Sequence, residues 1–183
     1  MFISVQELEL RKIEFSEAIR PGLIDFGPDL VQTSLLKTSG RAELVEENRG
    51  GKDLVEDIRI VGDFSVSMEA QCARCLDPVP GDFAGDFDLL YRPLGVDAGK
   101  DESSISEAET EIGYYSGKGI TLEDVLKEQV LLALPLKAVC RETCKGLCPH
   151  CGKNLNTGTC SCVTEVADPR WAALADLKSK LKS

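Results

Sequence analysis

The sequence predicts an α+β protein: an antiparallel β-sheet, arranged as a meander or partial barrel, with a covering helix, a C-terminal cysteine-rich loop and a terminal helix. Three observations predict this fold. Apolar and polar residues alternate with a period of two over residues 64–71 and 82–91, which is typical of strands with one buried face. Apolar residues recur at helical spacing over residues 121–134, and six of the eight cysteines fall within residues 140–162.

The strands of the predicted sheet are assigned from this alternation and from turn residues between the alternating runs. A hairpin is expected around Ser39-Gly40, and the Asn-Arg-Gly-Gly-Lys run at 48–52 is a strong turn signal. Gly62 is a candidate β-bulge, and Met1–Leu10 is a candidate edge strand. The predicted strands span residues 30–38, 41–47, 53–71 and 81–92.

One loop and two helices complete the prediction. Residues 95–119 are rich in Gly, Ser and acidic side chains, and we expect a mobile acidic loop there. Thr121 is predicted to cap a helix over 121–134, with Asp124 approximating a capping box, and the apolar face of this helix is expected to cover the sheet. Asp168-Pro169 predicts the start of a C-terminal helix, since Asp favours the N-cap and Pro the first helical position.

Composition and charge exclude several classes of protein. With 43% hydrophobic residues, the chain is too apolar to be wholly disordered. Its longest apolar run, Val130–Leu136, is far shorter than the roughly 20 residues of a membrane span. The first ten residues lack the basic start of a secretory signal, so we expect a cytoplasmic protein without membrane contact. The net charge of −10 argues against a generic nucleic-acid-coating protein.

Charge is divided unevenly between two predicted domains. The first, residues 1–135, contains the sheet, the acidic loop and the helix over 121–134, and the second, residues 136–183, contains the cysteine-rich loop and the terminal helix. The second domain holds eight Lys or Arg and four Asp or Glu, a net +4, which leaves −14 for the first. Such a split is compatible with a solvated surface, and also with a basic part that faces phosphate and an acidic part that faces a basic protein.

The cysteine-rich loop carries the clearest chemical signal. Clustered cysteines in a reducing compartment are more often metal ligands than disulfides. At the centre of the cluster, the run Cys-Pro-His-Cys-Gly at 148–152 allows two thiolates to reach one metal ion, and its glycine supplies the backbone angle of the turn. The sequence therefore predicts a Zn²⁺ loop, with Cys148 and Cys151 as the firmest ligands, followed by Cys144 and one of Cys160 or Cys162. The candidate ligands are the six cysteines of the segment: Cys148, Cys151, Cys144, Cys160, Cys162 and Cys140.

A second C-x-x-C pair, Cys72 and Cys75, lies upstream, where one predicted strand ends. This pair is a possible second metal or thiol site. Together with Cys140 and Cys144 it would complete a second set of four ligands; alternatively, the two residues are packed thiols or a redox pair. A thioredoxin-like motif is expected at a helix start beside a βαβ unit, and the flanks here are strand and Pro-Val-Pro.

The sequence offers few residues that suit catalysis. The single histidine, His150, lies between two candidate ligands and is expected to point to solvent. The carboxylates of residues 101–111 lie in the predicted mobile loop, which cannot hold the fixed geometry of general acid–base catalysis. We therefore expect no enzymatic activity and no small-molecule substrate.

Several segments together resemble one known family. They are Cys72-Ala-Arg-Cys-Leu-Asp-Pro78, Leu134-Pro-Leu-Lys137, Cys144-Lys-Gly-Leu-Cys-Pro-His-Cys-Gly-Lys-Asn-Leu-Asn156 and Asp168-Pro-Arg-Trp-Ala-Ala-Leu174. These runs resemble the YceD family, the large ribosomal RNA subunit accumulation proteins. The resemblance implies a non-enzymatic role in the accumulation of large-subunit (23S) rRNA, through ribosome assembly or rRNA processing.

The resemblance also implies a partner, either rRNA or a ribosomal protein of the large subunit. A structural zinc loop would hold basic side chains on one surface, where they can meet phosphates. The candidate contact residues are the basic side chains around the cysteine cluster: Lys137, Arg141, Lys145, Lys153 and Arg170. Lys145 and Lys153 have a second interpretation, in which they offset the −2 charge of a four-thiolate zinc site. The alternative function is a thiol redox or metal-sensing protein that uses Cys72 and Cys75.

Overall fold

A computed structural model describes residues 1–48, 54–96 and 112–162, and these form two compact units. The first unit comprises Met1–Gln71 and Pro78–Ala138. The second comprises Cys72–Asp77 together with the chain from Val139 onward. The second unit therefore draws on a short internal segment as well as on the C-terminal part.

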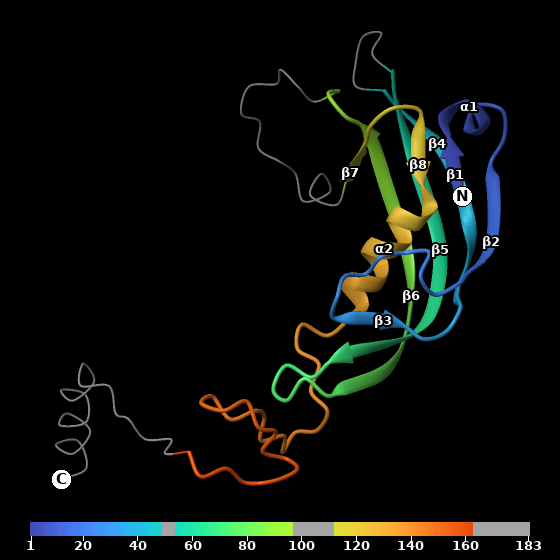
Figure 1. Ribbon diagram of the computed structural model, residues 1–183. Helices are drawn as coiled ribbons and strands as arrows, with labels where there is room; N and C mark the ends of the chain where they lie inside the picture. Colours follow the sequence, from blue (N-terminus) through green and yellow to red (C-terminus); the bar gives the residue numbers. More distant parts are fainter. Residues whose placement is uncertain (49–53, 97–111, 163–183) are drawn as a thin grey trace, which may run out of the picture. The chain divides into compact units, whose positions relative to one another are not determined.

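The first unit is built on an open, mixed sheet with strand order β2-β4-β5-β6-β7, in which β3 also pairs with β5. Neighbouring strands are antiparallel except for β6 and β7, which are parallel. A separate two-stranded sheet joins β1 and β8, and Figure 1 shows β4, β5 and β6 running side by side. In chain order the elements are β1 (Phe2–Ser4), α1 (Val5–Leu8), β2 (Ile13–Ile19), β3 (Leu30–Gln32), β4 (Leu36–Asn48), β5 (Leu54–Gln71), β6 (Pro78–Pro93), β7 (Ile112–Tyr115), β8 (Gly119–Thr121) and α2 (Leu122–Ala133).

The alternation that predicted strands over 53–71 and 81–92 corresponds to β5 and β6. On β5, Ile60, Phe64 and Met68 are buried, whereas Asp63 and Ser65 between them are exposed. Successive side chains of a strand point to opposite faces, so one face of the sheet lies on the core and the other faces solvent.

The predicted hairpin at Ser39-Gly40 and the predicted bulge at Gly62 are wrong. Strand β4 continues through both residues, and Gly40 lies directly opposite Gly62 in an unbroken register. A Cβ atom at Gly40 would lie 2.3 Å from the carbonyl oxygen of Val61 on β5 and 2.7 Å from Cζ of Phe15, so this glycine marks the close approach of the neighbouring strand and of an aromatic ring, and not a turn. The expected strand over 30–38 is instead interrupted at residues 33–35, where the Ser34 hydroxyl accepts a 2.8 Å hydrogen bond from the amide of Ser67.

Three further differences concern elements that the alternation did not assign. Strand β2 is absent from the prediction; it pairs with β4 from Ile13 to Ile19, and only Ile13, Phe15 and Ile19 of its residues are buried. The expected edge strand over Met1–Leu10 is only β1, and α1 follows it. The expected loop over 95–119 contains β7 and the start of β8; its central part, residues 97–111, lies outside the described residues, as does the predicted C-terminal helix.

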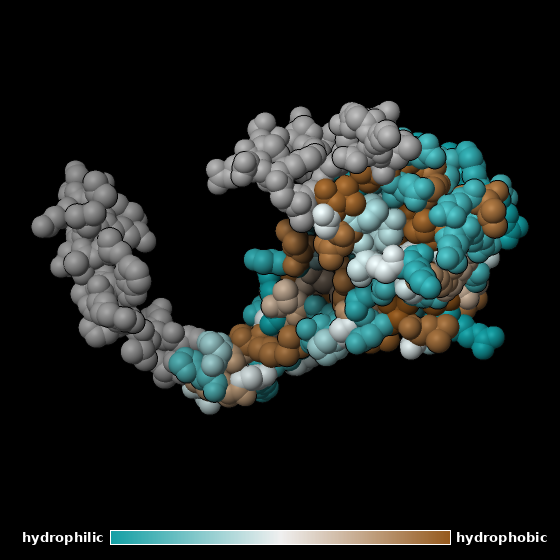
Figure 2. Space-filling model, turned by 90° about the horizontal axis from the view of Figure 1, so that it is seen from above, coloured by the Kyte–Doolittle hydropathy of each residue, from teal (hydrophilic) through white to brown (hydrophobic). Residues whose placement is uncertain are grey.

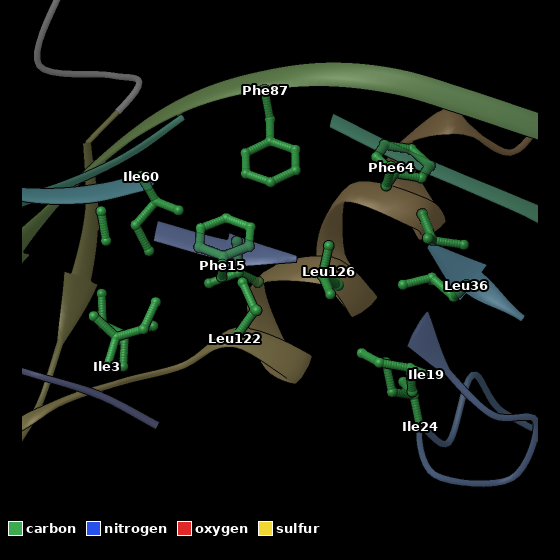
Figure 3. Close-up of a cluster of buried hydrophobic side chains, with 14 of the residues drawn as sticks. Ile3, Phe15, Ile19, Ile24, Leu36, Ile60, Phe64, Phe87, Leu122 and Leu126 are labelled. Atoms are coloured by element: carbon green, nitrogen blue, oxygen red, sulfur yellow. The ribbon is translucent and has the colours of Figure 1, made fainter. Parts of the chain in front are cut away.

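Helix α2 contributes its apolar side to the same core as the sheet. Its buried residues, Leu122, Val125, Leu126 and Val130, belong to one buried cluster with side chains of β2, β4, β5 and β6. Figure 3 shows aromatic rings from the sheet lying beside the labelled leucines of α2. Thr121 occupies the N-cap position as predicted, but its side chain makes no capping hydrogen bond, so the capping box is wrong.

One ion pair is buried in this unit. Arg92 donates to Asp57 from Nη2 at 2.9 Å and from Nε at 3.2 Å, and both side chains are almost fully buried. The face shown in Figure 2 mixes hydrophilic and apolar side chains. Leu23, Leu94 and Leu132 are among the exposed apolar residues of the first unit. Among the described helices, none is long and apolar enough to cross a membrane.

Candidate metal centres

Cys72 and Cys148 each begin a tight C-x-x-C turn with the same backbone hydrogen bonds. In the first turn, the amide of Leu76 donates to the carbonyl of Cys72, and the amide of Cys72 donates to the carbonyl of Asp77, both at 2.9 Å. In the second, the amide four residues after Cys148 donates to the Cys148 carbonyl at 2.9 Å, and the Cys148 amide donates to the carbonyl five residues on at 2.8 Å. The two turns therefore have the same backbone hydrogen bonds at equivalent positions.

Both turns require a left-handed residue directly after the second cysteine. Gly152 has φ of +71°, in the region that glycine adopts without steric cost. The equivalent position of the first turn is Leu76, with φ of +63°, the only non-glycine residue with positive φ in the described part of the chain. The glycine identified from the sequence thus has the predicted backbone role.

The eight cysteines gather into two sets of four. The first tetrad is Cys72, Cys75, Cys140 and Cys144, and the second tetrad is Cys148, Cys151, Cys160 and Cys162. Within each tetrad all four sulfur atoms lie within 4.8 Å of one another, and all eight cysteines are free thiols. Cys144 therefore lies with the upstream pair and not with Cys148 and Cys151.

The spacing of the sulfur atoms fits a tetrahedral zinc ion. Zn–S bonds of about 2.3 Å in a tetrahedron place neighbouring sulfurs about 3.8 Å apart. In the first tetrad the Sγ atoms of Cys72 and Cys144 are 3.9 Å apart, and those of Cys75 and Cys140 are 3.7 Å apart. A disulfide needs about 2.05 Å, so these distances fit four ligands around one ion and exclude a sulfur–sulfur bond. Four-cysteine donor sets are typical of structural zinc.

Backbone amides favour the thiolate form that a metal requires. The amide of Cys140 lies 3.4 Å from the sulfur of Cys72 and lowers the pKa of Cys72 to about 6. In the second tetrad, a hydrogen bond from the backbone amide of Cys151 lowers the pKa of Cys148, also to about 6. Burial raises the pKa of Cys75 above that of an ordinary thiol. Each tetrad thus contains at least one cysteine whose thiolate form is stabilised by backbone hydrogen bonds.

Two asparagines of the second tetrad's loop reach the first tetrad. The side-chain amide of Asn156 donates to the sulfur of Cys144 at 3.3 Å. That of Asn154 donates to both carboxylate oxygens of Asp77, at 3.0 and 3.2 Å, and the Asp77 carboxylate accepts from the thiol of Cys75 at 3.2 Å. Asn154 and Asn156 are joined through a 3.0 Å side-chain hydrogen bond. All of these residues lie in the second unit.

Arg74 also joins the two parts of the second unit. Its guanidinium donates to the carbonyls of Glu142 and Cys144 at 2.9 and 3.1 Å, and its own carbonyl accepts from the amide of Leu147 at 2.9 Å. At this contact Gly146, with φ of +74°, approaches so closely that a Cβ atom would lie 2.9 Å from the Arg74 carbonyl oxygen. The turn after β5 is therefore held to the C-terminal segment by backbone contacts as well as by its cysteines.

The candidate contact residues are dispersed. Lys137 belongs to the first unit, whereas Arg141, Lys145 and Lys153 lie exposed in the second. Lys153 already donates to the carbonyl of Thr159 at 2.7 Å. Arg170 lies outside the described residues. His150 is exposed, as expected.

Sequence reasoning assigned no role to Arg74, Asp77, Asn154 and Asn156. The sequence does mark these positions, because all four lie inside the two cysteine motifs that carry the family resemblance. Metal-site arguments based on cysteine spacing pass over such residues, since hydrogen bonds around the ligands depend on contacts between distant segments.

Comparison with known proteins identifies relatives of the chain. The family model for YceD, the large ribosomal RNA subunit accumulation protein, matches residues 60–178. An uncharacterized protein of Mycobacterium tuberculosis is 34% identical over 122 residues, which is 67% of this chain and 56% of that protein. The large ribosomal RNA subunit accumulation protein YCED homolog 1, chloroplastic, of Zea mays is 27% identical over 128 residues, covering 57% of this chain and 44% of the maize protein.

The matched segment thus spans only about half the length of these curated relatives. No solved structure matches the chain. The family match covers both C-x-x-C turns and both tetrads as well as β6 and α2. The chain therefore belongs to the YceD family of large ribosomal RNA subunit accumulation proteins.

Proposed function

We propose that this protein is a zinc-stabilised, non-enzymatic factor that promotes accumulation of large-subunit (23S) rRNA, through ribosome assembly or rRNA processing, in the cytoplasm. The link to rRNA comes from the family and from the name of the maize relative. The observation that carries the mechanism is the pairing of two complete four-cysteine sets in one small unit. Such a set surrounds its ion and leaves no position for substrate or water, so the ion serves folding and not chemistry.

Zinc in both tetrads changes the charge argument for RNA contact. A zinc ion with four thiolates carries −2, so two such sites would contribute −4. The second unit, Cys72–Asp77 with residues 139–183, holds eight Lys or Arg and five Asp or Glu, a net +3, which this −4 offsets. General attraction of this region to phosphate is then weak. Direct RNA contact would depend on individual exposed side chains, of which Arg141 and Lys145 are the best placed in the second unit.

A protein partner is supported by a groove in the first unit. The groove, of about 410 Å³, is lined by the aromatic side chains of Phe2, Tyr91 and Tyr114 and by the carboxylates of Asp124 and Glu128. Aromatic rings beside carboxylates suit a lysine or arginine side chain, because the rings attract cations and the carboxylates pair with them. The basic tails of ribosomal proteins have this chemistry, and the −14 charge of residues 1–135 favours their approach.

The function is tested in cells that depend on this protein. Cys148→Ser/Cys151→Ser should lower the amount of mature large-subunit rRNA relative to small-subunit rRNA, together with loss of zinc from the purified protein. Ser161→Ala, an exposed change within the same loop, is the matched control and should affect neither. Normal rRNA ratios in a variant that has lost its zinc would refute the proposed role of the metal.

The partner is identified by crosslinking in the same cells. Arg141→Glu/Lys145→Glu should reduce recovery of large-subunit rRNA if RNA contact is direct, and the interaction should weaken as salt rises. Asp124→Lys/Glu128→Lys should instead reduce recovery of ribosomal proteins if the groove is the contact. Zinc content is measured on the same samples, because loss of zinc from Arg141→Glu/Lys145→Glu would mean that Lys145 offsets the charge of a zinc site and is not an RNA contact.

The thiol redox alternative has no support from the geometry of its pair. Cys72 and Cys75 are 0% and 3% exposed, whereas a redox thiolate must be reached by its disulfide substrate. Rapid alkylation of either cysteine in the zinc-loaded protein would favour the alternative over the proposal.

A further inference from the structure

The two tetrads are connected by side chains that neither metal ion would bind. Asn154 and Asn156 lie between Cys151 and Cys160, within the loop that the second tetrad closes. Their amides donate outward, to Asp77 and to the sulfur of Cys144, both at the first tetrad. The second tetrad's loop thus supplies part of the hydrogen-bonding shell of the first.

We propose that Asn154 and Asn156 couple the two tetrads, so that metal bound at the second tetrad raises the metal affinity of the first. This inference rests on the proposed zinc content of the protein and extends it from two separate sites to one cooperative pair. Asn154 and Asn156 act as positioning residues, since they orient and stabilise ligands without touching the ion.

The physical basis is preorganisation. A metal ion in the second tetrad joins the Cys148–Cys151 turn to Cys160 and Cys162 and so fixes the loop between them. The Asn156 amide then lies ready to donate to the Cys144 thiolate, and a hydrogen bond to a charged acceptor is about twice as strong as a neutral one. Without metal in the second tetrad, ordering the loop would oppose metal binding at the first.

The position of Asn156 is fixed by further contacts in the same loop. Its side-chain oxygen accepts from the amide of Lys145 at 2.8 Å, next to Cys144 in the chain, and its backbone amide donates to the side-chain oxygen of Asn154 at 2.9 Å. One asparagine therefore contacts a ligand sulfur, the backbone beside that ligand, and the residue that holds Asp77. Substitutions of such outer hydrogen-bonding partners typically lower metal affinity about 10- to 100-fold.

Thermodynamic reciprocity sharpens the proposal. If metal at the second tetrad raises the affinity of the first by some factor, metal at the first must raise the affinity of the second by the same factor. Both affinities are measured on the full-length chain by titration with Co²⁺, whose thiolate complexes absorb visible light. Cys148→Ser/Cys151→Ser isolates the first tetrad, and Cys72→Ser/Cys75→Ser isolates the second.

We expect each isolated tetrad to bind Co²⁺ about 10- to 100-fold more weakly than the same tetrad in the intact protein. Asn156→Ala in the intact protein should lower the affinity of the first tetrad by a similar factor. The same substitution should have little effect once Cys148→Ser/Cys151→Ser has already removed the coupling. Asn154→Ala should act in the same direction, and Ser161→Ala, which alters an exposed side chain in the loop, should leave both affinities unchanged.

Three outcomes would overturn the inference, and they are distinguishable. Equal Co²⁺ affinities for isolated and paired tetrads would show two independent sites, leaving the proposed zinc function intact. An Asn156→Ala variant with unchanged affinities would mean that coupling, if present, does not pass through this side chain. Absence of Co²⁺ and Zn²⁺ binding in the intact protein would refute both the inference and the proposed function.

Discussion

Gly146 provides a quantitative test of how the two parts of the second unit fit together. It has φ of +74°, and a Cβ atom added to it would lie 2.9 Å from the carbonyl oxygen of Arg74. That oxygen accepts a hydrogen bond from Leu147, so it cannot move away without loss of the bond. Gly146→Ala therefore combines an unfavourable backbone angle with a steric clash against fixed backbone.

Gly152 separates these two costs. Its φ of +71° is almost the same, but nothing lies within 4 Å of an added Cβ atom, so Gly152→Ala tests the backbone angle alone. A non-glycine residue in the left-handed conformation lowers the free energy of unfolding by about 1–2 kcal/mol. Alanine also restricts the unfolded chain more than glycine does, which raises the free energy of unfolding by about 0.4–1 kcal/mol. Gly152→Ala should thus destabilise the second unit by about 1 kcal/mol. The clash at Gly146 adds about 1–3 kcal/mol, giving about 2–4 kcal/mol for Gly146→Ala.

Zinc affinity reports these costs, because the binding free energy of a structural zinc site is folding free energy. At about 1.4 kcal/mol per factor of ten, Gly152→Ala should weaken zinc binding about fivefold and Gly146→Ala at least about 25-fold. The assay is a competition titration of the zinc-loaded chain with a chelator of known affinity. Equal losses in the two variants, within a factor of two, would refute the proposed contact between Gly146 and Arg74.

Three further outcomes are expected. Gly40→Ala should destabilise the first unit by about 1–3 kcal/mol in urea unfolding, because the new methyl group meets the backbone of β5 at Val61 and Gly62 and the ring of Phe15; a variant as stable as the parent would contradict the packing. Asp57→Ala should cost about 3–5 kcal/mol by the same measurement, since it leaves Arg92 buried without this carboxylate; a loss below 1 kcal/mol would argue against the buried pair. Removal of zinc should increase hydrogen exchange at residues 72–77 as well as in the C-terminal segment while the strand signal in circular dichroism persists, because the apolar core lies in the first unit; unfolding of the whole chain would contradict this division.

Local patterns predicted the parts of the fold that depend on neighbouring residues. The period-two alternation predicts the two long strands β5 and β6 almost to their ends, because residues on one face of each are less exposed than those on the other over most of the strand. The C-x-x-C spacing with Gly152 likewise predicted a compact turn, since its hydrogen bonds form between residues four and five apart. Strand β2 is not predicted because its alternation is interrupted: Glu17 stands where an apolar residue would follow Phe15, and its side chain is exposed.

Glycines were misread where their role depends on tertiary contacts. Ser39-Gly40 has the composition of a turn, yet Gly40 is extended in β4, where the backbone of β5 at Val61 and the ring of Phe15 leave no room for a side chain. The residues next to Gly40 in the sequence do not indicate these contacts, because the contacts come from other strands. The same limit applies to Gly62, which lies opposite Gly40 and receives the ring of Phe87 where a bulge was expected.

The sequence by itself determined that this protein has a one-sided sheet, a cysteine-rich segment and the motifs of its family. Only the tertiary structure decided which cysteines lie together in each tetrad. Cys75 and Cys140 are 65 residues apart, and no spacing rule relates them. Their sulfurs meet because Arg74 and Asp77 on the turn after β5 find hydrogen-bonding partners in the C-terminal segment, among them Asn154. The spacing of cysteines within a motif can be seen in the sequence. The grouping of cysteines from different motifs depends on which distant segments form hydrogen bonds with one another.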